Sequence, residues 1–181
     1  MKSKALEGHV ALVTGSSTGL GKGVLFALAQ AGAKVVMNYA HNQARAEAAF
    51  AELKAAGGEG VLIQASAVDA DQIQAMVEQA SAMLGKIDIV VPNATPDQPQ
   101  KPIEEYDWEF YQSMLDYFVK SPYLLTKATL PSMKANGWGR IVNIGSEVYQ
   151  ASVGNFSAYV AAKGGQTGWT RSMATELAPH G

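Results

Sequence analysis

Short apolar runs alternate with longer helical segments along almost the whole chain, and this alternation most restricts the possible folds. The runs predicted as strands are Val10–Thr14, Lys34–Tyr39, Gly60–Ala65, Ile87–Val91 and Arg140–Ile144. The segments predicted as helices are approximately Leu20–Ala31, Gln43–Ala56, Asp71–Leu84, Tyr106–Lys134 and Ser157–Leu177. Their expected ends are marked by Gly32, Gly57, Gly85 and Gly137. Because the runs are apolar throughout, the pattern predicts an α/β protein with a doubly wound parallel sheet and helices on both faces.

The first predicted strand runs directly into the glycine-rich segment Thr14–Gly21 and then into a helix. Glycines let the backbone turn tightly and approach a pyrophosphate, whose charge the exposed amides and the positive helix end can hold. Between a first strand and a first helix, the pattern G-x-x-x-G-x-G predicts a dinucleotide-binding loop, with a purely structural turn as the alternative. The residues expected to contact the cofactor are Gly15, Ser17, Gly19, Leu20 and Gly21.

Tyr159 and Lys163 are four residues apart in the last predicted helix, so their side chains should share one face. A neighbouring ammonium favours the phenolate over the phenol, which makes the pair a candidate acid/base device. Tyr123 and Lys127 repeat the spacing, so the spacing alone is not sufficient. What distinguishes the first pair is Ser146, which follows the fifth predicted strand and precedes Tyr159 by 13 residues. Ser146 could instead satisfy a backbone group at the strand end.

Composition excludes several classes of function. With 181 residues the chain suits one domain over residues 1–181, and a net charge of −2 provides no basic surface for nucleic acid. The sequence has no cysteine for disulfides or thiolate metal sites, and its three histidines share no metal-ligand spacing with carboxylates. The apolar runs are too short to cross a bilayer. We therefore predict a cytoplasmic protein without a nucleic-acid, membrane or metal partner.

Taken together, these features resemble the short-chain dehydrogenase/reductase family, in particular its single-domain carbonyl and 3-oxoacyl reductases with a Rossmann-like fold. The resemblance rests on the glycine loop, Asn93 and Ala94 after the fourth strand, Ser146, Tyr159 and Lys163. It extends from His9 to Gly181. Members of the family continue into a further strand, a substrate-covering loop and a last strand. This sequence ends before them, so the C-terminal strands are expected to be missing.

The resemblance implies hydride transfer between NADP(H), or NAD(H) as the alternative, and a ketone or secondary alcohol, including 3-oxoacyl groups. Tyr159 would exchange a proton with the substrate oxygen, Lys163 would assist it and hold the nicotinamide ribose, and Ser146 would hydrogen-bond the same oxygen. The further cofactor contacts that it implies are Asn38, Tyr39, Ser66, Ala67, Asn93 and Ala94. In the family that the chain resembles, the helix corresponding to the aromatic-rich segment Trp108 to Tyr123 packs against a second subunit, so the resemblance implies a homo-oligomer, either a dimer or a tetramer.

The end of the second predicted strand favours NADP. Relatives that prefer NAD carry an acidic residue there, whereas this chain has Asn38, Tyr39, Ala40 and His41. His41 or Arg45 could reach a 2′-phosphate, or both could be ordinary solvated residues. Thr18 occupies a position where many NADP enzymes carry a basic residue.

Four positions depart from the family pattern. Pro92 and Thr95 flank Asn93 and Ala94 where the family has asparagine and glycine, and a threonine tolerates positive φ poorly. Phe118 replaces the asparagine that holds a relay water, and Ser66 replaces an aspartate. A second hypothesis is therefore a catalytically degenerate nucleotide-binding protein. A third, a dehalogenase-like relative without nicotinamide, is disfavoured by the intact glycine loop and by Lys163.

Overall fold

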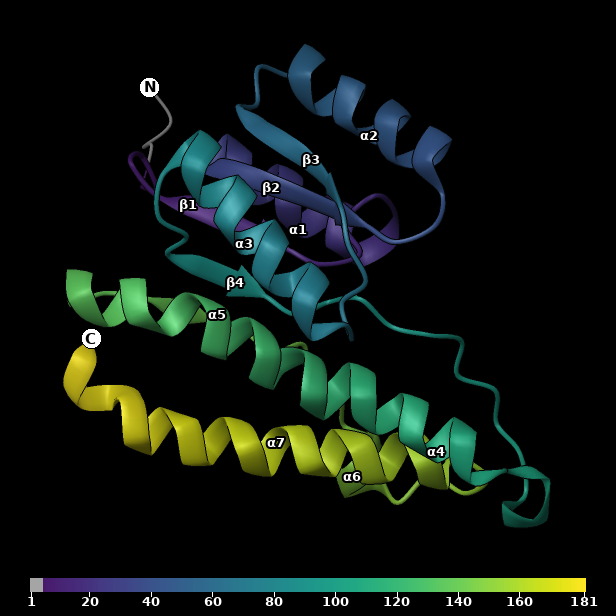
Figure 1. Ribbon diagram of the computed structural model, residues 1–181. Coiled ribbons are helices and arrows are strands. Elements are labelled where there is room, and N and C mark those ends of the chain that lie inside the picture. The colour runs from purple at the N-terminus through teal and green to yellow at the C-terminus, as the bar shows by residue number, and fades with distance from the viewer. Residues whose placement is uncertain (1–4) are drawn as a thin grey trace.

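The computed structural model describes residues 5–181, and its centre is one parallel sheet (Figure 1). The strands are β1 (Val10–Val13), β2 (Lys34–Tyr39), β3 (Gly60–Gln64), β4 (Ile89–Val91) and β5 (Arg140–Ile141). They are arranged in the order β3-β2-β1-β4-β5, and every pairing is parallel. The chain therefore crosses from β3 over to the other side of β1, as a doubly wound sheet requires.

Helices connect the strands and cover both faces of the sheet (Figure 1). They are α1 (Gly19–Gln30), α2 (Gln43–Ala55), α3 (Ala70–Leu84), α4 (Trp108–Leu115), α5 (Ser121–Asn136), α6 (Val148–Ala151) and α7 (Ser157–Leu177). Three short helical turns accompany them. They are the 3-10 turn η1 (Ile103–Glu105) before α4, the π-helical turn η2 (Asp116–Lys120) between α4 and α5, and the 3-10 turn η3 (Ala178–His180) after α7. No helix within residues 5–181 combines the length and the apolar character that a membrane span needs.

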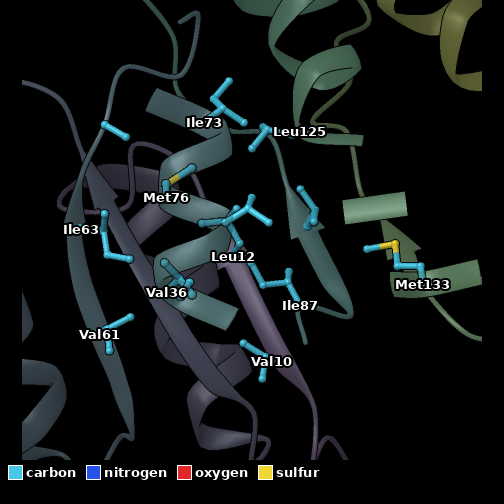
Figure 2. Packing of buried hydrophobic residues seen from close by; sticks show 14 residues of the cluster. Val10, Leu12, Val36, Val61, Ile63, Ile73, Met76, Ile87, Leu125 and Met133 are labelled. Atoms are coloured by element: carbon cyan, nitrogen blue, oxygen red, sulfur yellow. The ribbon is translucent and has the colours of Figure 1, made fainter. Parts of the chain in front are cut away.

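Two clusters of buried side chains explain why the strands are apolar on both faces. On one face, Leu12 and Val36 of the sheet pack with Met76 of α3 and Leu125 of α5 (Figure 2). On the other face, the alternate residues of the same strands pack with α1 and α2. That second cluster includes Ala11, Val13, Leu25, Met37, Ala49 and Leu53. The sequence-based prediction of helices on both faces is therefore confirmed.

A third, smaller cluster lies away from the sheet and joins α4, the turn η2 and α7. Its buried members are Met114, Phe118, Ala158 and Ala162. Aromatic side chains that are only partly buried, Tyr159 among them, pack around it. This cluster sets where the first half of α7 lies relative to the turn η2.

The predicted helix Tyr106–Lys134 is confirmed as helical from Trp108 to Asn136, but the π-helical turn η2 interrupts the α-helical hydrogen bonding between α4 and α5. Pro122 has no N–H to donate to the carbonyl of Phe118, four residues earlier. At this point the helix widens, and the N–H of Ser121 donates to the carbonyl of Asp116, five residues earlier. Proline thus creates a π-helical turn whose residues face α7.

The fifth strand is also shorter than predicted. The N–H of Val142 still donates to the carbonyl of Val90 at 2.9 Å, but β4 ends one residue later, at Val91. The segment from Asn143 to Ile144 therefore continues without a neighbouring strand. The short helix α6 was not predicted, whereas the bounds of β2 and α7 are those predicted, and β1, β3 and β4 differ by one or two residues.

Candidate active site

A cleft of about 400 Å³ opens at the carboxyl ends of β1, β2 and β4. It is lined by the glycine loop, the end of β2, residues 92–95, the turn η2 and the first turns of α7. Ligands bind at this edge in open α/β sheets. A second cavity of about 210 Å³ lies between α5 and the C-terminal half of α7, and its lining is mostly apolar. The first cleft is therefore the candidate site.

Thr14 anchors the glycine loop to the segment after β4. Its side chain is fully buried, and its Oγ1 accepts hydrogen bonds from the backbone N–H groups of Asn93 at 2.9 Å and Ala94 at 3.1 Å. In return, Nδ2 of Asn93 donates to the carbonyl of Thr14 at 2.9 Å and to that of Gly15 at 3.3 Å. These bonds fix the spacing between two walls of the cleft.

Asn38 and Ser16 hold the loop from behind. Oδ1 of Asn38 accepts from the N–H of Gly15 at 3.1 Å, and its Nδ2 donates to the carbonyl of Ala65 at 3.0 Å. Oγ of Ser16 accepts from the N–H of Asn38 at 3.0 Å and donates to the carbonyl of Val13 at 2.7 Å. Asn38 is 1% exposed and does not line the cleft. It supports the loop, where the sequence had suggested a direct cofactor contact.

Close packing requires glycine at two positions of the loop. A Cβ on Gly21 would lie against Nδ2 of Asn93 and 2.8 Å from the carbonyl oxygen of Gly15. Gly15 has a φ of +61°, and a Cβ there would lie 2.9 Å from Cα of Ala94. Even an alanine would therefore force the loop away from the segment after β4.

The start of α1, at the edge of the cleft, has no side-chain cap, and neither do the starts of α5, α6 and α7. Asn42, Asp69 and Asp107 each accept a hydrogen bond from a first-turn N–H of α2, α3 and α4, respectively. Thr18 makes no such bond at the start of α1. The first-turn amides of α1 therefore lack a side-chain cap at the edge of the cleft, where an anionic ligand can accept from them.

Tyr159 and Lys163 both line the opposite end of the cleft. Tyr159 is half-buried between Phe118, at 5.2 Å between ring centroids, and Phe156, at 4.7 Å. Within residues 5–181 its hydroxyl makes no hydrogen bond, so it can meet a ligand. Tyr123 and Lys127, in contrast, lie exposed on α5, outside the cleft.

Lys163 is 3% exposed and hydrogen-bonded inside the protein. Its Nζ donates to the carbonyl of Ile144 at 2.5 Å and to Oε1 of Gln166 at 3.0 Å. The ammonium also lies 4.0 Å from the ring centroid of Phe118. Burial lowers the pKa of Lys163 from its ordinary 10.5 to about 8, because the low-dielectric surroundings disfavour the charged form.

Besides Asn38, three further predicted site residues lie outside the lining of the cleft. Ser146 is half-buried, and its Oγ is 3.4 Å from the N–H of Val148, which fits the alternative of a strand-end hydroxyl. Oγ of Ser66 is 3.4 Å from the N–H of Val68, and the Ser66 N–H donates to Gln72. Ala67 is buried.

Other predicted residues stand in the cleft as expected. The lining includes Gly15, Ser17, Gly19, Leu20, Gly21, Tyr39, Asn93 and Ala94. Pro92 and Thr95 line it too, and the expected strain at Thr95 is wrong. Among the described residues, Ser152 and Asn155 are the non-glycine positions with positive φ, so the backbone at Thr95 is relaxed.

Sequence reasoning missed several residues of the site. Gln98 and Tyr117 line the cleft, and Gln166 binds Lys163. Gln166 follows Lys163 by three residues on the same helix, a spacing that could have identified it. No comparable pattern marks Gln98, which lies in an irregular segment, or Tyr117, whose direction depends on the π-helical turn.

The charges around the cleft are one-sided. Its lining contains His41, Arg45 and Lys163 but no aspartate or glutamate among the described residues. Tyr39, His41 and Arg45 stand together near the end of β2. Within residues 5–181, no group of three potential metal ligands occurs. The cleft therefore suits an anionic ligand.

Known proteins resemble the chain over nearly all of its length. A sequence model described as short chain dehydrogenase matches residues 9–181. A 3-oxoacyl-(acyl-carrier-protein) reductase of Synechocystis sp. is 38% identical over 179 residues, which cover 98% of this chain and 71% of that protein. A reductase of the same name, FabG, from Staphylococcus aureus is 37% identical over 175 residues, covering 94% and 69%. The crystal structure of a metagenomic short-chain oxidoreductase in complex with NADP superposes with a TM-score of 0.90 at 34% identity, covering 97% and 79%.

Proposed function

Because the chain belongs to the short-chain dehydrogenase family, we propose that it is an oxidoreductase that prefers NADP(H) and interconverts a ketone with its secondary alcohol. Residues 1–181 would act as one dinucleotide-binding domain. The observation that carries the proposal is the meeting, in one cleft, of an uncapped helix start with the Tyr159–Lys163 pair. The substrate class includes 3-oxoacyl groups, since the relatives above are named as reductases of such groups.

The residues present fit the cofactor. The amides at the start of α1, from Gly19 to Gly21, would hold the diphosphate, and Gly19 has open space where a Cβ would project. Asn93 and Ala94 would form the wall beside the nicotinamide half, and Lys163 would bind its ribose. When bound, NADP(H) supplies or accepts the hydride.

Tyr159 would be the proton donor in the direction of carbonyl reduction. As hydride reaches the carbonyl carbon, the proton of its hydroxyl passes to the carbonyl oxygen, and the phenolate left behind is stabilised by the Lys163 ammonium. A proton from water restores the phenol. Ser146 would hydrogen-bond the substrate oxygen, which requires its Oγ to turn from the N–H of Val148 towards the cleft.

The end of β2 supports the preference for NADP. With no carboxylate in the lining, nothing there repels a 2′-phosphate, and Arg45 and His41 offer positive or hydrogen-bonding groups.

Titration of tryptophan fluorescence should give a lower Kd for NADPH than for NADH. Arg45→Ala should raise the NADPH Kd about five- to tenfold and leave that for NADH unchanged. Lys22→Ala, which removes an ion pair with Glu52 outside the cleft lining, is the control. Equal binding of the two cofactors would contradict this preference.

The alternative function is a catalytically degenerate nucleotide-binding protein, which Phe118 favours because it cannot hydrogen-bond a relay water. A panel of ketones, including 3-oxoacyl thioesters, assayed with NADPH separates the two. Turnover that Tyr159→Phe abolishes supports the oxidoreductase. Tight NADPH binding without turnover of any ketone supports the binding protein.

The outer surface of α4 and α5 supports assembly into a homo-oligomer. Trp108 is 66% exposed and stacks on Tyr111 at 5.9 Å between centroids, and Tyr123 is 46% exposed. Exposed aromatic side chains of this kind are enriched in protein interfaces. Light scattering after size exclusion should give a dimer or tetramer mass, and Trp108→Glu should shift it towards the monomer. A monomeric wild type would contradict the proposal.

A further inference from the structure

The Lys163 ammonium is enclosed by groups that come from three separate elements. Ile144 supplies a carbonyl from the segment after β5, Gln166 an amide oxygen from α7, and Phe118 a ring face from the turn η2. An ammonium has three N–H donors. Two of them are used by the two oxygens, and the ring lies 4.0 Å from Nζ on a further side.

Each of these groups is available for a local reason. The Ile144 carbonyl is free because β4 ends at Val91, so no strand lies beside residue 144. Phe118 faces α7 because Pro122 imposes the π-helical turn. Gln166 is itself 3% exposed, and Oε1 has Lys163 as its hydrogen-bond donor. A buried amide oxygen without a donor would be costly, so Gln166 depends on the hydrogen bond from Lys163.

We propose that Gln166 and Phe118 are positioning residues that hold the Lys163 ammonium in a site from which water is excluded. This site, formed by Gln166, Phe118 and the Ile144 carbonyl, is called the seat. Gln166 fixes the position of Nζ through a hydrogen bond, and Phe118 occupies the space through which water would otherwise approach. The role of this arrangement in catalysis rests on the proposed function, in which Lys163 acts through Tyr159. The seat itself exists in the protein without ligand and can be tested separately.

Among the described residues, none of the groups that face the ammonium is a carboxylate or a second cation. These groups are the Ile144 carbonyl, the Gln166 amide and the rings of Phe118 and Tyr159. Within residues 5–181, no carboxylate forms an ion pair with Lys163. One substitution can therefore change the proton affinity of the amine in a known direction. A carboxylate at position 166 favours the ammonium, and loss of the amide oxygen disfavours it.

Labelling by acetic anhydride between pH 7 and 11, followed by peptide mass spectrometry, tests the seat without any cofactor or substrate. Lys127, exposed on α5, is labelled on the same molecule and corrects for the reagent. We expect Gln166→Glu to move the labelling midpoint of Lys163 upward by about one pH unit or more, and Phe118→Asn to move it upward by admitting water. We expect Gln166→Leu to move it downward.

Two results would overturn the proposal. The first is a Lys163 midpoint that stays within about 0.3 units in both Gln166→Glu and Phe118→Asn, with near-ultraviolet circular dichroism showing that both variants are folded. The second is a rise in midpoint in Gln166→Leu. Should Gln166→Leu fail to fold, Gln166→Glu and Phe118→Leu, which keeps an apolar side chain but removes the ring face, decide the question. In Phe118→Leu we expect the midpoint to fall, and a rise or an unchanged midpoint would count against the seat.

Kinetics separate a failure of this proposal from a failure of the proposed function. If the wild type turns over a ketone, Gln166→Leu should lower kcat about tenfold and shift its pH profile, while KM changes less than twofold, and Gln166→Asn should recover part of kcat. A normal kcat and pH profile in Gln166→Leu would overturn the positioning role and leave the oxidoreductase standing. A wild type without turnover would reject the proposed function, and the labelling would still decide the seat.

Discussion

The two ends of the cleft are built in different ways. At the end near β1 and α1, backbone amides form the surface, and buried side chains of Thr14, Ser16 and Asn38 hold that backbone in place. At the end near α7, the side chains of Tyr159 and Lys163 form the surface, and backbone and aromatic groups hold them. The first end is encoded mostly by a short loop and its anchors. The second depends on how three distant elements pack together.

The helices at the two ends pack against different parts of the molecule. α1 packs Leu25 into the core beside the sheet. α7 packs Ala158 and Ala162 against α4 and the turn η2, in the smaller cluster away from the sheet. Both helices contain three glycines, which lower helix stability, so each relies on this packing to keep its position. The acid/base end should therefore be the more sensitive to changes elsewhere in the molecule.

The largest expected effect is on chemistry at the α7 end. Tyr159→Phe should lower kcat by a factor of about 10² to 10⁴, the range of general acid catalysis, because the transferred proton is removed. The Kd for NADPH should change less than about twofold, since the ring stays in place. Tyr123→Phe is the matched control, with the same four-residue spacing to a lysine and no place in the cleft. Equal kcat losses in the two variants would contradict the assignment.

The second-largest expected effect concerns the other end of the cleft, at the glycine loop. Gly21→Ala should reduce unfolding free energy by about 1–3 kcal/mol and weaken NADPH binding more than tenfold, because the new Cβ meets Asn93 and the Gly15 carbonyl. Gly23→Ala lies in the same helix with no atom near its Cβ, and should be neutral or stabilising by up to about 1 kcal/mol. Urea titration and fluorescence measure both. If Gly21→Ala binds like Gly23→Ala, the close packing described for the loop is not needed.

The third effect comes from the titration of Lys163. Between pH 8 and 9.5 it should raise the free energy of unfolding by about 1–2 kcal/mol. In the folded protein its pKa is about 8, against 10.5 in the unfolded chain. Below pH 8 both states hold the proton, and the folded state carries the full cost of the buried ammonium. Between the two values the unfolded chain binds more protons, so stability rises with pH.

Urea unfolding of the wild type and of Lys163→Met at pH 8.0, 8.75 and 9.5 measures this contribution, because other titrating groups cancel in the difference. The wild type should gain stability relative to the variant as pH rises. A difference that is flat across this range, or that falls, would show that burial does not destabilise the charged amine.

The smallest effect tests the weakness of α7. Gly168→Ala should raise the free energy of unfolding by about 0.5–1 kcal/mol, because Gly168 lies inside the helix with no atom within 4 Å of a built Cβ. kcat and KM should stay unchanged, and the melting temperature reports the gain. A loss of stability would mean that the helix needs flexibility at this position.

Local chemistry accounts for what the sequence predicted well. The apolar run Lys34–Tyr39 and the segment Ser157–Leu177 were placed with their observed bounds. The glycine loop was recognised because its spacing and its position after a strand both carry the signal. The π-helical turn within Tyr106–Lys134 was missed, although Pro122 could have predicted it.

What the sequence did not predict concerns atoms whose direction the residue types do not reveal. Asn38 turns behind the loop, and only the packing of β2 between β1 and β3 shows this. The partner of Lys163 at residue 144 is a backbone carbonyl, which every residue possesses. Its availability depends on β4 being shorter than the segment beside it, and that is a property of the assembled sheet.

The missing side-chain cap at Thr18 has a consequence for the lifetime of the protein. The first-turn N–H groups of α1 are left for a ligand to bind. The free energy of folding therefore depends on the concentration of that ligand. A bound anion at one hundred times its Kd adds about 2.7 kcal/mol, roughly a hundredfold fewer unfolded molecules. Starvation for such a ligand would expose the first turn of α1 to fraying and proteolysis, so the abundance of the protein would follow the supply of the molecule that it binds.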